Sequence, residues 1–239
     1  MTDRSTAHIA GNVRHVRDMI ADTALRSGRN PADVRLMAVT KTRTASEVDA
    51  VIRAGIPLVG ENTVQEAEAK RSQVTESAEW HMIGHLQSNK VANALATFSM
   101  IQSVDSVKLA ERIARLAERE RPFAVGDNGR VPVLIEVNTS GEESKYGFTP
   151  DEVLDAFGAI REIGSLSVRG FMTIGKFVDN EAEVRACFAT LREIRERAAS
   201  QSGDDLPVLS MGMTSDFAWA VEEGSTLVRV GTAIFGPRG

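Results

Sequence analysis

The feature that most constrains this chain is a regular alternation of strand and helix patterns along nearly all of its 239 residues. An amphipathic helix opens the chain, because Ile9, Val13, Val16 and Ile20 recur at helical spacing, and short apolar runs then alternate with longer amphipathic segments. The predicted strands are 34–40, 57–60, 79–83, 100–104, 131–137, 167–172, 207–210 and 226–230. The predicted helices are 45–54, 62–76, 88–96, 106–121, 150–162, 180–200 and 214–223.

Eight strands, each of the first seven followed by a helix, predict an α/β fold. We expect a single (β/α)8 TIM barrel with an extra N-terminal helix. Runs such as 131–137 are apolar almost throughout, which is typical of a parallel strand that is covered on both faces. One domain is expected over 1–239, with the helix in 1–30 and the barrel in 31–239. The alternative is a doubly wound open sheet. The lack of a G-x-G-x-x-G sequence after the first strand disfavours a dinucleotide fold.

Composition limits the classes of partner. Lys and Arg total 28 against 33 Asp and Glu, and this net charge of −5 argues against nucleic acid or an anionic membrane as the main partner. No apolar run is long enough for a membrane span, and the charged segment 1–10 lacks the apolar core of a secretory signal. We therefore expect a cytoplasmic protein. The single cysteine, Cys187, is predicted to be a buried thiol on a helix rather than a nucleophile.

A lysine ends the first strand. The largely apolar run 34–40 stops at Lys41, at the carboxyl end of the strand, where barrels of this class place their chemistry. Strand alternation puts Met37, Val39 and Lys41 on one face. If that face is the barrel interior, desolvation favours the neutral amine, which is a nucleophile toward carbonyls. The alternative is a lysine that leaves the strand and pairs with a loop carboxylate.

Two loops near the C-terminus form a candidate anion site. Residues 210–216 follow the seventh predicted strand and residues 231–236 follow the eighth, and these two loops are the usual phosphate site of a TIM barrel. Each loop opens a helix or helical turn whose free N–H groups favour an anion. The residues suited to phosphate binding are Gly212, Thr214, Gly231 and Thr232. The alternative is that Thr214 or Ser215 merely caps the helix.

Arg229 lies on the same strand face as Leu227 and Gly231, and so points into the barrel if Gly231 lines the phosphate site. A buried guanidinium needs an acceptor. One candidate is a carboxylate such as Glu136. The other is the ring nitrogen of a heterocyclic ligand whose phosphate lies at Gly231 and Thr232.

An amine at the first strand, a phosphate site at the seventh and eighth, and an arginine between them match three parts of pyridoxal 5′-phosphate (PLP). With these features in place, the chain closely resembles, nearly end to end, the YggS/PROSC family of pyridoxal phosphate homeostasis proteins. The resemblance is carried by AVTK at 38–41, GENTVQE at 60–66, WHMIGHLQSNK at 80–90, residues 138–147, GFMTI at 170–174 and both C-terminal loops.

The resemblance implies a fold-type III barrel like the N-terminal domain of alanine racemase, with pyridoxal 5′-phosphate as cofactor. It implies that Lys41 holds the cofactor as a Schiff base and that Arg229 faces the ring nitrogen. The other implied cofactor-binding residues are Asn62, Met172, Ser210, Thr214, Gly231 and Thr232. Thr214 stands where many relatives have serine, and it retains the hydroxyl. The implied function is vitamin B6 homeostasis, with the cofactor passed to apo-enzymes that require it. No catalytic residue is established and no metal is expected. We expect a monomer.

Two other functions remain open from the residues. One is a PLP-dependent amino-acid racemase or lyase of the same barrel type, and the other is an aldolase in which Lys41 reacts directly with substrate. An arginine beside the ring nitrogen opposes protonation of the ring and weakens it as an electron sink. Racemases offset this with an acid/base group opposite the lysine, typically a tyrosine. The one tyrosine in this chain is Tyr146.

The remaining candidate acid/base groups are assigned from their positions. His81 is predicted to be a satisfied core histidine, and His85, at the end of the third strand, is predicted at the rim of the site. Lys145 is interpreted as an exposed loop lysine, with a second amine that accepts the cofactor as the alternative. The loop 138–147 that carries it is predicted to be a solvated surface loop, or else a cover over the site.

Overall fold

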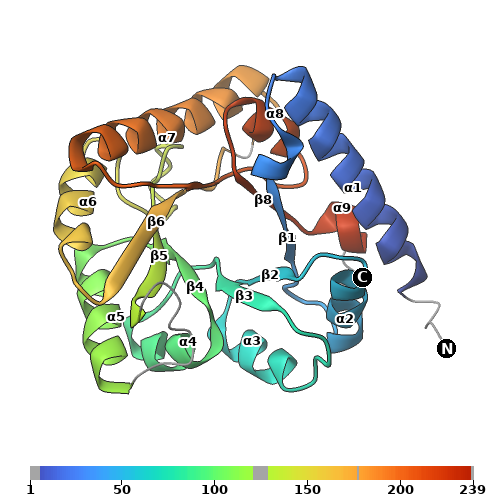
Figure 1. Cartoon of the computed structure of the whole chain (residues 1–239), viewed down its shortest axis with the longest axis horizontal. Helices are drawn as coiled ribbons and strands as arrows, with labels where there is room; N and C mark the ends of the chain where they lie inside the picture. The colour runs from blue at the N-terminus through green and yellow to red at the C-terminus, as the bar shows by residue number, and fades with distance from the viewer. Residues whose placement is uncertain (1–5, 121–128, 177, 238–239) are drawn as a thin grey trace.

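The computed structural model describes residues 6–120, 129–176 and 178–237. Eight strands form a closed parallel barrel with helices around its outside (Figure 1), so the predicted fold class is confirmed. Each strand pairs with its neighbours in chain order, and β1 pairs with β8, with Met37 opposite Arg229, to close the ring. The strands are β1 Arg35–Val39, β2 Leu58–Glu61, β3 Glu79–Met82, β4 Met100–Val104, β5 Val131–Glu136, β6 Leu166–Met172, β7 Val208–Ser210 and β8 Leu227–Val230.

The helices follow the predicted order. They are α1 Ala7–Arg26, α2 Ala45–Arg53, α3 Val64–Arg71, α4 Val91–Thr97, α5 Val107–Glu120, α6 Val153–Arg161, α7 Glu181–Ser202, α8 Phe217–Glu222 and α9 Thr232–Phe235, with short 3-10 turns η1 Pro31–Asp33 and η2 Ser88–Lys90. The predicted helix 62–76 is too long. It ends at Arg71 because the backbone N–H groups of Thr75 and Glu76 donate to Asp49 of α2, both at 2.9 Å, and so hold that segment in a turn.

The apolar core has two layers. The larger layer lies between the strands and the surrounding helices. The thiol of Cys187 on α7 is buried, as predicted. A smaller cluster inside the barrel contains Met37, Leu58, Ile83 and Leu227, with Val39 and Val208 packed against it. Met37 and Val39 therefore point into the barrel, so the face of β1 that they share with Lys41 is the interior one, the condition that the sequence left open.

The N-terminal helix α1 packs across the end of the chain. Its predicted apolar stripe is buried, and Figure 1 shows it running beside α8 and α9. Asn12 Nδ2 donates to the carbonyl of Ile234 at 2.9 Å, and His8 Nε2 lies 3.2 Å from the carbonyl of Phe235. Helix α1 thus supports the loop that follows β8.

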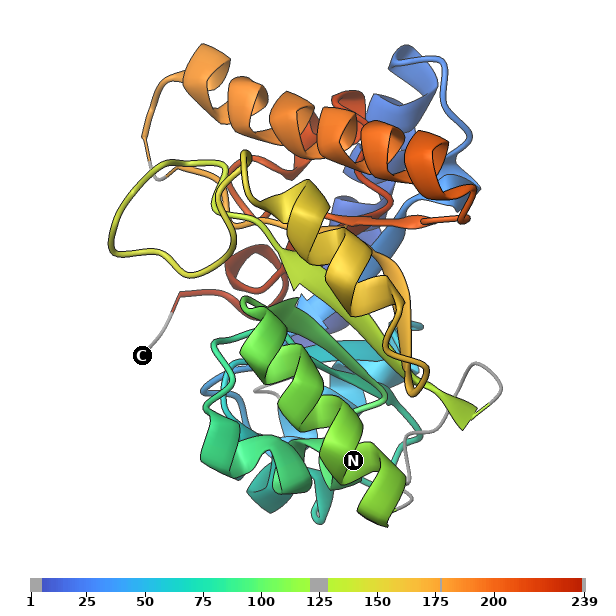
Figure 2. The ribbon, with the colours of Figure 1, turned by 90° about the vertical axis from the view of Figure 1, so that its left-hand side faces the viewer.

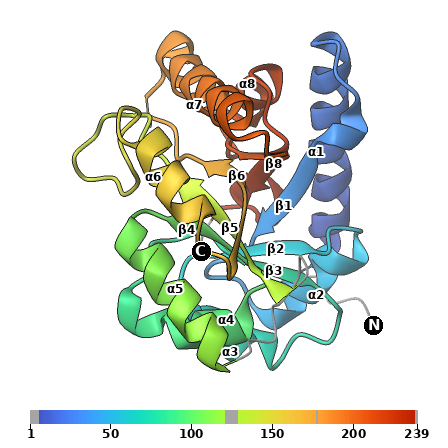
Figure 3. The same ribbon diagram turned by 60° about the vertical axis from the view of Figure 1, so that its left-hand side comes forward.

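The carboxyl ends of the strands form one face of the barrel. Figure 2 shows the loop after β5 standing out on this side, where α9 also lies, and Figure 3 shows the same loop beyond α6. Within the described ranges, no helix combines the length and the apolar character that crossing a bilayer requires.

Candidate cofactor site

A cavity of about 240 Å³ opens at the carboxyl ends of the strands. It brings together Lys41 after β1, Asn62 after β2 and Arg229 of β8, three of the predicted cofactor-binding residues. Its wall also contains His85 and residues 144–146 of the loop after β5. Strands far apart in the sequence thus converge on one polar cavity.

Lys41 lies on a turn that is held in place by a network of buried ion pairs. The carboxylate of Glu61, fully buried, accepts from Lys70 Nζ and from Thr40 Oγ1, both at 2.6 Å. Lys70 Nζ also donates to the carbonyl of Thr40 at 2.6 Å and to Glu66 Oε1 at 2.9 Å. Burial raises the pKa of Glu61, which the Lys70 and Thr40 hydrogen bonds oppose. These bonds fix the residue immediately before Lys41.

The residue immediately after Lys41 is held in an unusual conformation. Thr42 has a φ of +64°, in the left-handed region that β-branched residues rarely occupy. Its backbone N–H donates to Glu66 Oε1, the same oxygen that accepts from Lys70. The turn is therefore over-determined by hydrogen bonds on both sides, and the side chain of Lys41 is presented to the cavity.

Arg229 closes the floor of the cavity. Its side chain is almost fully buried, and it donates from Nη1 to Ser210 Oγ at 2.6 Å and from Nη2 to the carbonyl of Thr173 at 2.7 Å. Burial lowers its pKa to about 10, against the attraction of Glu136 and Asp216. The guanidinium therefore remains a cation near neutral pH, with its plane fixed by two bonds.

Glu136, at the end of β5, also lines the cavity but makes no direct ion pair with Arg229. The direct Glu136–Arg229 pairing considered from sequence is wrong, because Arg229 bonds to Ser210 and Thr173 instead. Burial raises the pKa of Glu136 to about 7, with Asp105 acting in the same direction and Arg229 opposing it. Among the described residues, no donor reaches its buried Oε2.

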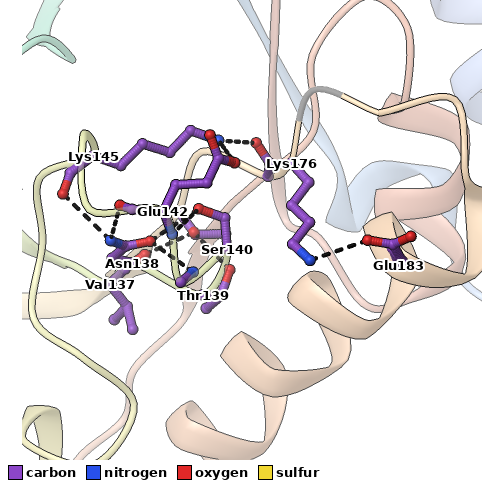
Figure 4. A network of polar contacts seen from close by, with 11 residues as sticks. Val137, Asn138, Thr139, Ser140, Glu142, Lys145, Lys176 and Glu183 are labelled. Carbon is purple, nitrogen blue, oxygen red and sulfur yellow. Dashed lines mark hydrogen bonds and ion pairs between the residues drawn. The ribbon is translucent and has the colours of Figure 1, made fainter.

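The loop after β5 is a surface loop, with Gly141, Glu143 and Tyr146 exposed, and it also forms a wall of the cavity, so both interpretations made from the sequence hold in part. Its two ends pair through the backbone, with Phe148 N donating to Glu136 O and Asn138 N to Phe148 O, both at 2.9 Å. Inside the loop, Asn138 Nδ2 donates to the carbonyl of Glu142 at 2.9 Å, as Figure 4 shows. The loop is therefore compact and internally bonded.

Lys145 ties this loop to the next one rather than pointing freely into solvent. Its Nζ donates to Glu142 Oε1 at 2.6 Å (Figure 4). It also donates to the carbonyl of Gly175, after β6, at 2.9 Å. Its side chain is only 18% exposed and lines the cavity. The sequence interpretation as an exposed loop lysine is therefore wrong.

The opposite side of the loop rests on His85. The rings of His85 and Tyr146 stack with their centroids 3.7 Å apart, and His85 Nδ1 lies 2.9 Å from Asp105 Oδ2. Both rings line the cavity, which confirms His85 as a rim residue. Acid/base groups therefore do stand in the wall that also contains Lys41.

The two loops predicted to bind phosphate meet each other at this cavity. Met213 of the loop after β7 lines the cavity, whereas the predicted phosphate-binding residues Gly212, Thr214, Gly231 and Thr232 are not among its lining residues. The N–H of Ala233 lies 3.4 Å from Thr214 Oγ1, which joins the loop after β7 to α9. Thr232 is exposed on α9. Helix α8 begins only at Phe217, after Asp216, so capping by Thr214 or Ser215 is wrong.

Gly212 and Gly84 stand where any side chain would collide with a neighbouring element. Gly212 has a φ of +95°, and a Cβ there would lie 2.5 Å from the Cβ of Ala220, so close packing of the loop on α8 requires glycine. A Cβ at Gly84 would lie 2.3 Å from the carbonyl of Asn62. The close approach of these two loops helps to place Asn62 at the cavity.

Two predicted pocket residues, Met172 and Ser210, are fully buried and are not in the cavity wall. Ser210 lies behind the cavity wall and contacts the site through its bond to Arg229.

His81 is 1% exposed, which confirms it as a core histidine. Sequence reasoning missed Glu61 and Lys70. A glutamate on an otherwise apolar strand was the available signal.

The described residues fit a phosphorylated aldehyde with a heterocyclic ring. Lys41 offers an amine, Arg229 and the orphaned Oε2 of Glu136 offer polar groups on the floor, and the Thr214 and Thr232 loops lie alongside. In the part of the chain that the structure describes, no group of three or more His, Cys, Asp or Glu side chains is arranged to hold a metal ion.

Comparison with known proteins places this geometry in a family. The protein-family model described as the alanine racemase N-terminal domain matches residues 5–239 of this chain. A pyridoxal phosphate homeostasis protein of Aquifex aeolicus is 37% identical over 224 residues, 93% of this chain and 95% of that protein. It bears the name of a homeostasis protein rather than of an enzyme, which agrees with the predicted non-enzymatic role.

Solved structures agree. A protein of Bifidobacterium adolescentis described as unknown is 39% identical with a TM-score of 0.91, covering 98% of this chain and 96% of that one. PipY of Synechococcus elongatus PCC7942, solved with PLP bound, is 35% identical with a TM-score of 0.76, covering 91% of this chain and 100% of that one. By identity, coverage and barrel geometry, the chain belongs to the pyridoxal phosphate homeostasis proteins, a family with the fold of the alanine racemase N-terminal domain.

Proposed function

We propose that this protein binds pyridoxal 5′-phosphate in the cavity, holds it as a Schiff base on Lys41 and passes it to apo-enzymes in intracellular vitamin B6 homeostasis. The observation that carries the proposal is the convergence of Lys41 and Arg229 on one cavity at the carboxyl ends of β1 and β8. When bound, the cofactor supplies an aldehyde that condenses with an amine, forming a C=N bond and releasing water.

The chain's own residues have distinct roles in this proposal. Lys41 provides the amine, on a turn fixed by the Glu61–Lys70 network. Arg229 presents a fixed cation to the ring, which opposes protonation of the ring nitrogen. The hydroxyls of Thr214 and Thr232, with neighbouring backbone N–H groups, bind the phosphate. A monomeric, cytoplasmic protein remains our prediction.

A carrier is favoured over an amino-acid racemase for two reasons. Arg229 weakens the ring as an electron sink, and the family is named for homeostasis. The absence of an acid/base partner is not a reason, because His85 and Tyr146 stand in the cavity wall. The two functions are therefore separated by experiment.

Replacing Lys41 by alanine should abolish both covalent cofactor binding and transfer. Borohydride reduction followed by peptide mass spectrometry should find the cofactor mass on the Lys41 peptide of the wild type and no adduct there in Lys41→Ala. Loaded wild type should reactivate an apo-enzyme that requires PLP, whereas a chiral assay over a panel of amino acids should show negligible turnover. Lys108→Ala, which removes an exposed lysine of α5, is the control.

Two outcomes would count against this proposal. Turnover of a panel member that disappears in Lys41→Ala would establish the racemase or lyase function instead. An adduct that maps to Lys145 in untreated wild type would move the amine to the other lysine in the cavity wall.

The phosphate should contribute most of the affinity. Hydrogen bonds to charged groups contribute roughly 1.5–3 kcal/mol each, so pyridoxal should bind at least about tenfold more weakly than its phosphate. Thr232→Ala should narrow that gap, whereas Thr190→Ala on α7 should not. Equilibrium titration of both ligands measures the gap, and equal affinities for pyridoxal and its phosphate would contradict phosphate binding by these loops.

A further inference from the structure

A continuous chain of side-chain hydrogen bonds crosses the barrel from Arg229 at the cavity to the opposite end. Its central bond joins Ser210 Oγ of β7 to Gln102 Oε1 of β4 at 2.6 Å. Strands β4 and β7 are not neighbours in the barrel, so this bond must cross the interior. The other bonds are Arg229 Nη1–Ser210 Oγ at 2.6 Å, Gln102 Nε2–His81 Nδ1 at 2.8 Å, His81 Nε2–Glu79 Oε1 at 2.7 Å and Arg35 Nη2–Glu79 Oε2 at 2.7 Å.

Only the far end of this chain meets water. Ser210 and Gln102 are fully buried and His81 is 1% exposed, whereas the side chains of Arg35 and Glu79 are 54% and 40% exposed at the start of β1 and β3. Buried polar groups without partners are costly, so each member of the buried part depends on the orientation of the next one.

The charge of Glu79 sets the direction of every bond. Hydrogen bonds from His81 and Arg35 lower the pKa of Glu79 to about 2, so it is a carboxylate that only accepts. His81 must therefore carry its hydrogen on Nε2. Burial lowers the pKa of His81, and the neutral ring then presents a lone pair on Nδ1.

The orientation of His81 determines the orientations of Gln102 and Ser210, the next two residues toward the cavity. Gln102 must turn its amide N–H toward His81, which leaves its carbonyl facing Ser210. The Ser210 hydroxyl donates to that carbonyl and keeps its oxygen lone pairs for Arg229. An imidazolium at His81 would reverse Gln102, and the hydroxyl hydrogen of Ser210 would lose its acceptor.

We propose that Glu79, His81 and Gln102 are positioning residues for Arg229. They hold the Ser210 hydroxyl as an acceptor and so fix the rotation at which the guanidinium faces the cavity. The charged groups around the chain are Arg35 and Glu79 at His81, and Glu136 and Asp216 at Arg229. The identity of the ligand group that Arg229 faces rests on the proposed function. The series of hydrogen bonds from Arg229 to Arg35 does not depend on it.

The first test uses cofactor-free protein labelled with ¹⁵N. Long-range ¹H–¹⁵N spectra should show His81 neutral and protonated on Nε2 at pH 7, with the signals assigned by their loss in His81→Phe. The guanidinium N–H signals of Arg229, assigned with Arg229→Lys, should be resolved in the wild type, and the Nη1 signals should shift or broaden in Gln102→Met, in which the bond from Nη2 to the carbonyl of Thr173 remains. An imidazolium or an Nδ1–H tautomer, or Arg229 signals unchanged in Gln102→Met, would overturn the proposal.

The second test asks whether positioning reaches the bound cofactor. Gln102→Met should weaken PLP binding roughly three- to tenfold, the equivalent of one lost neutral hydrogen bond, and should shift the pH midpoint of the bound chromophore. Gln102→Glu keeps an acceptor for Ser210, and the proton it draws onto His81 balances its charge, so it should bind like the wild type.

Thr97→Val is the matched control, because it removes the hydroxyl hydrogen bond of a buried threonine to the carbonyl of Asn93 in α4. An equal loss of affinity in Thr97→Val and Gln102→Met, or no rescue by Gln102→Glu, would reduce Gln102 to a structural residue. If the wild type binds no PLP, the proposed function fails, and the spectra of the cofactor-free protein still decide whether the chain positions Arg229.

Discussion

Replacing Lys70 by methionine should destabilise the folded protein by about 3–5 kcal/mol, the range for breaking a buried ion pair on one side. The ammonium is the partner of Glu61 at 2.6 Å, in a place where the carboxylate is fully buried. Methionine keeps the length of the side chain but leaves Glu61 without its cation. Urea unfolding of the cofactor-free protein at pH 8 measures the loss of free energy.

The loss should depend on pH with a defined sign. The pKa of Glu61 is already raised by burial, and removing Lys70 raises it further. The folded variant then holds a proton that the unfolded chain releases, so its stability falls as pH rises above the ordinary value of 4.5. The difference between Lys70→Met and the wild type should therefore shrink as the pH is lowered from 8 to 5.

Two control variants distinguish the loss of the buried Glu61–Lys70 ion pair from the loss of a charge elsewhere in the protein. Arg53→Met removes the half-exposed bridge to Glu76 at 3.2 Å and should cost no more than about 1 kcal/mol. Adding Glu61→Gln to Lys70→Met removes the buried charge and should restore most of the stability. A loss below about 1 kcal/mol in the single Lys70 variant would show that the network does not support the Lys41 turn.

Glu136→Gln should make the cofactor-free protein more stable than the wild type at pH 8 by roughly 3 kcal/mol. The folded pKa of Glu136 is about 7 and the ordinary value is 4.5. The unfolded chain releases this proton near pH 4.5, whereas the folded protein keeps it up to about pH 7. Since each pH unit between the two values corresponds to about 1.4 kcal/mol, the stability of the wild type falls progressively as pH rises from about 4.5 to 7. Glutamine has nearly the same shape and no proton to lose.

The measurement is a pair of urea titrations at each pH from 4.5 to 8.5. The difference between the two proteins isolates Glu136 from other groups that titrate in the folded state, including Asp216. It should grow across that range and level off above about pH 7. Glu111→Gln on the exposed face of α5 should give a flat difference. A flat difference for Glu136→Gln as well would contradict the raised pKa.

The strand and helix order followed from local patterns. Apolar runs of strand length, alternating with amphipathic segments, are properties of neighbouring residues, and they yielded all eight strands with small shifts at their ends. Strand parity grouped Met37, Val39 and Lys41 on one face of β1 and Arg229 with Leu227 and Gly231 on one face of β8, and the closed barrel then showed that these faces point inward. Lys41 was located because a strand in a parallel barrel delivers its last residues to the carboxyl face.

The partners of these residues could not be predicted in the same way. Ser210 and Gln102 are 108 positions apart, and nothing local to either residue indicates the other. The end of α3 at Arg71 was also missed, because the turn that follows it is held by Asp49, which lies on a different helix. Lys145 was interpreted as exposed because its neighbours are polar, whereas the carbonyl it contacts belongs to the loop after β6.

The sequence by itself thus determined the barrel, the strand that ends on Lys41 and the strand face that Arg229 shares with Leu227, because each depends on residues close together in the chain. Only the tertiary structure decided that Arg229 bonds to Ser210 rather than Glu136, that Glu136 retains an orphaned oxygen, and that the loop after β5 forms a wall of the cavity. These outcomes depend on which strand ends meet when the sheet closes, and on burial, which sets the charge and hydrogen-bond direction of each polar group only after the barrel has formed.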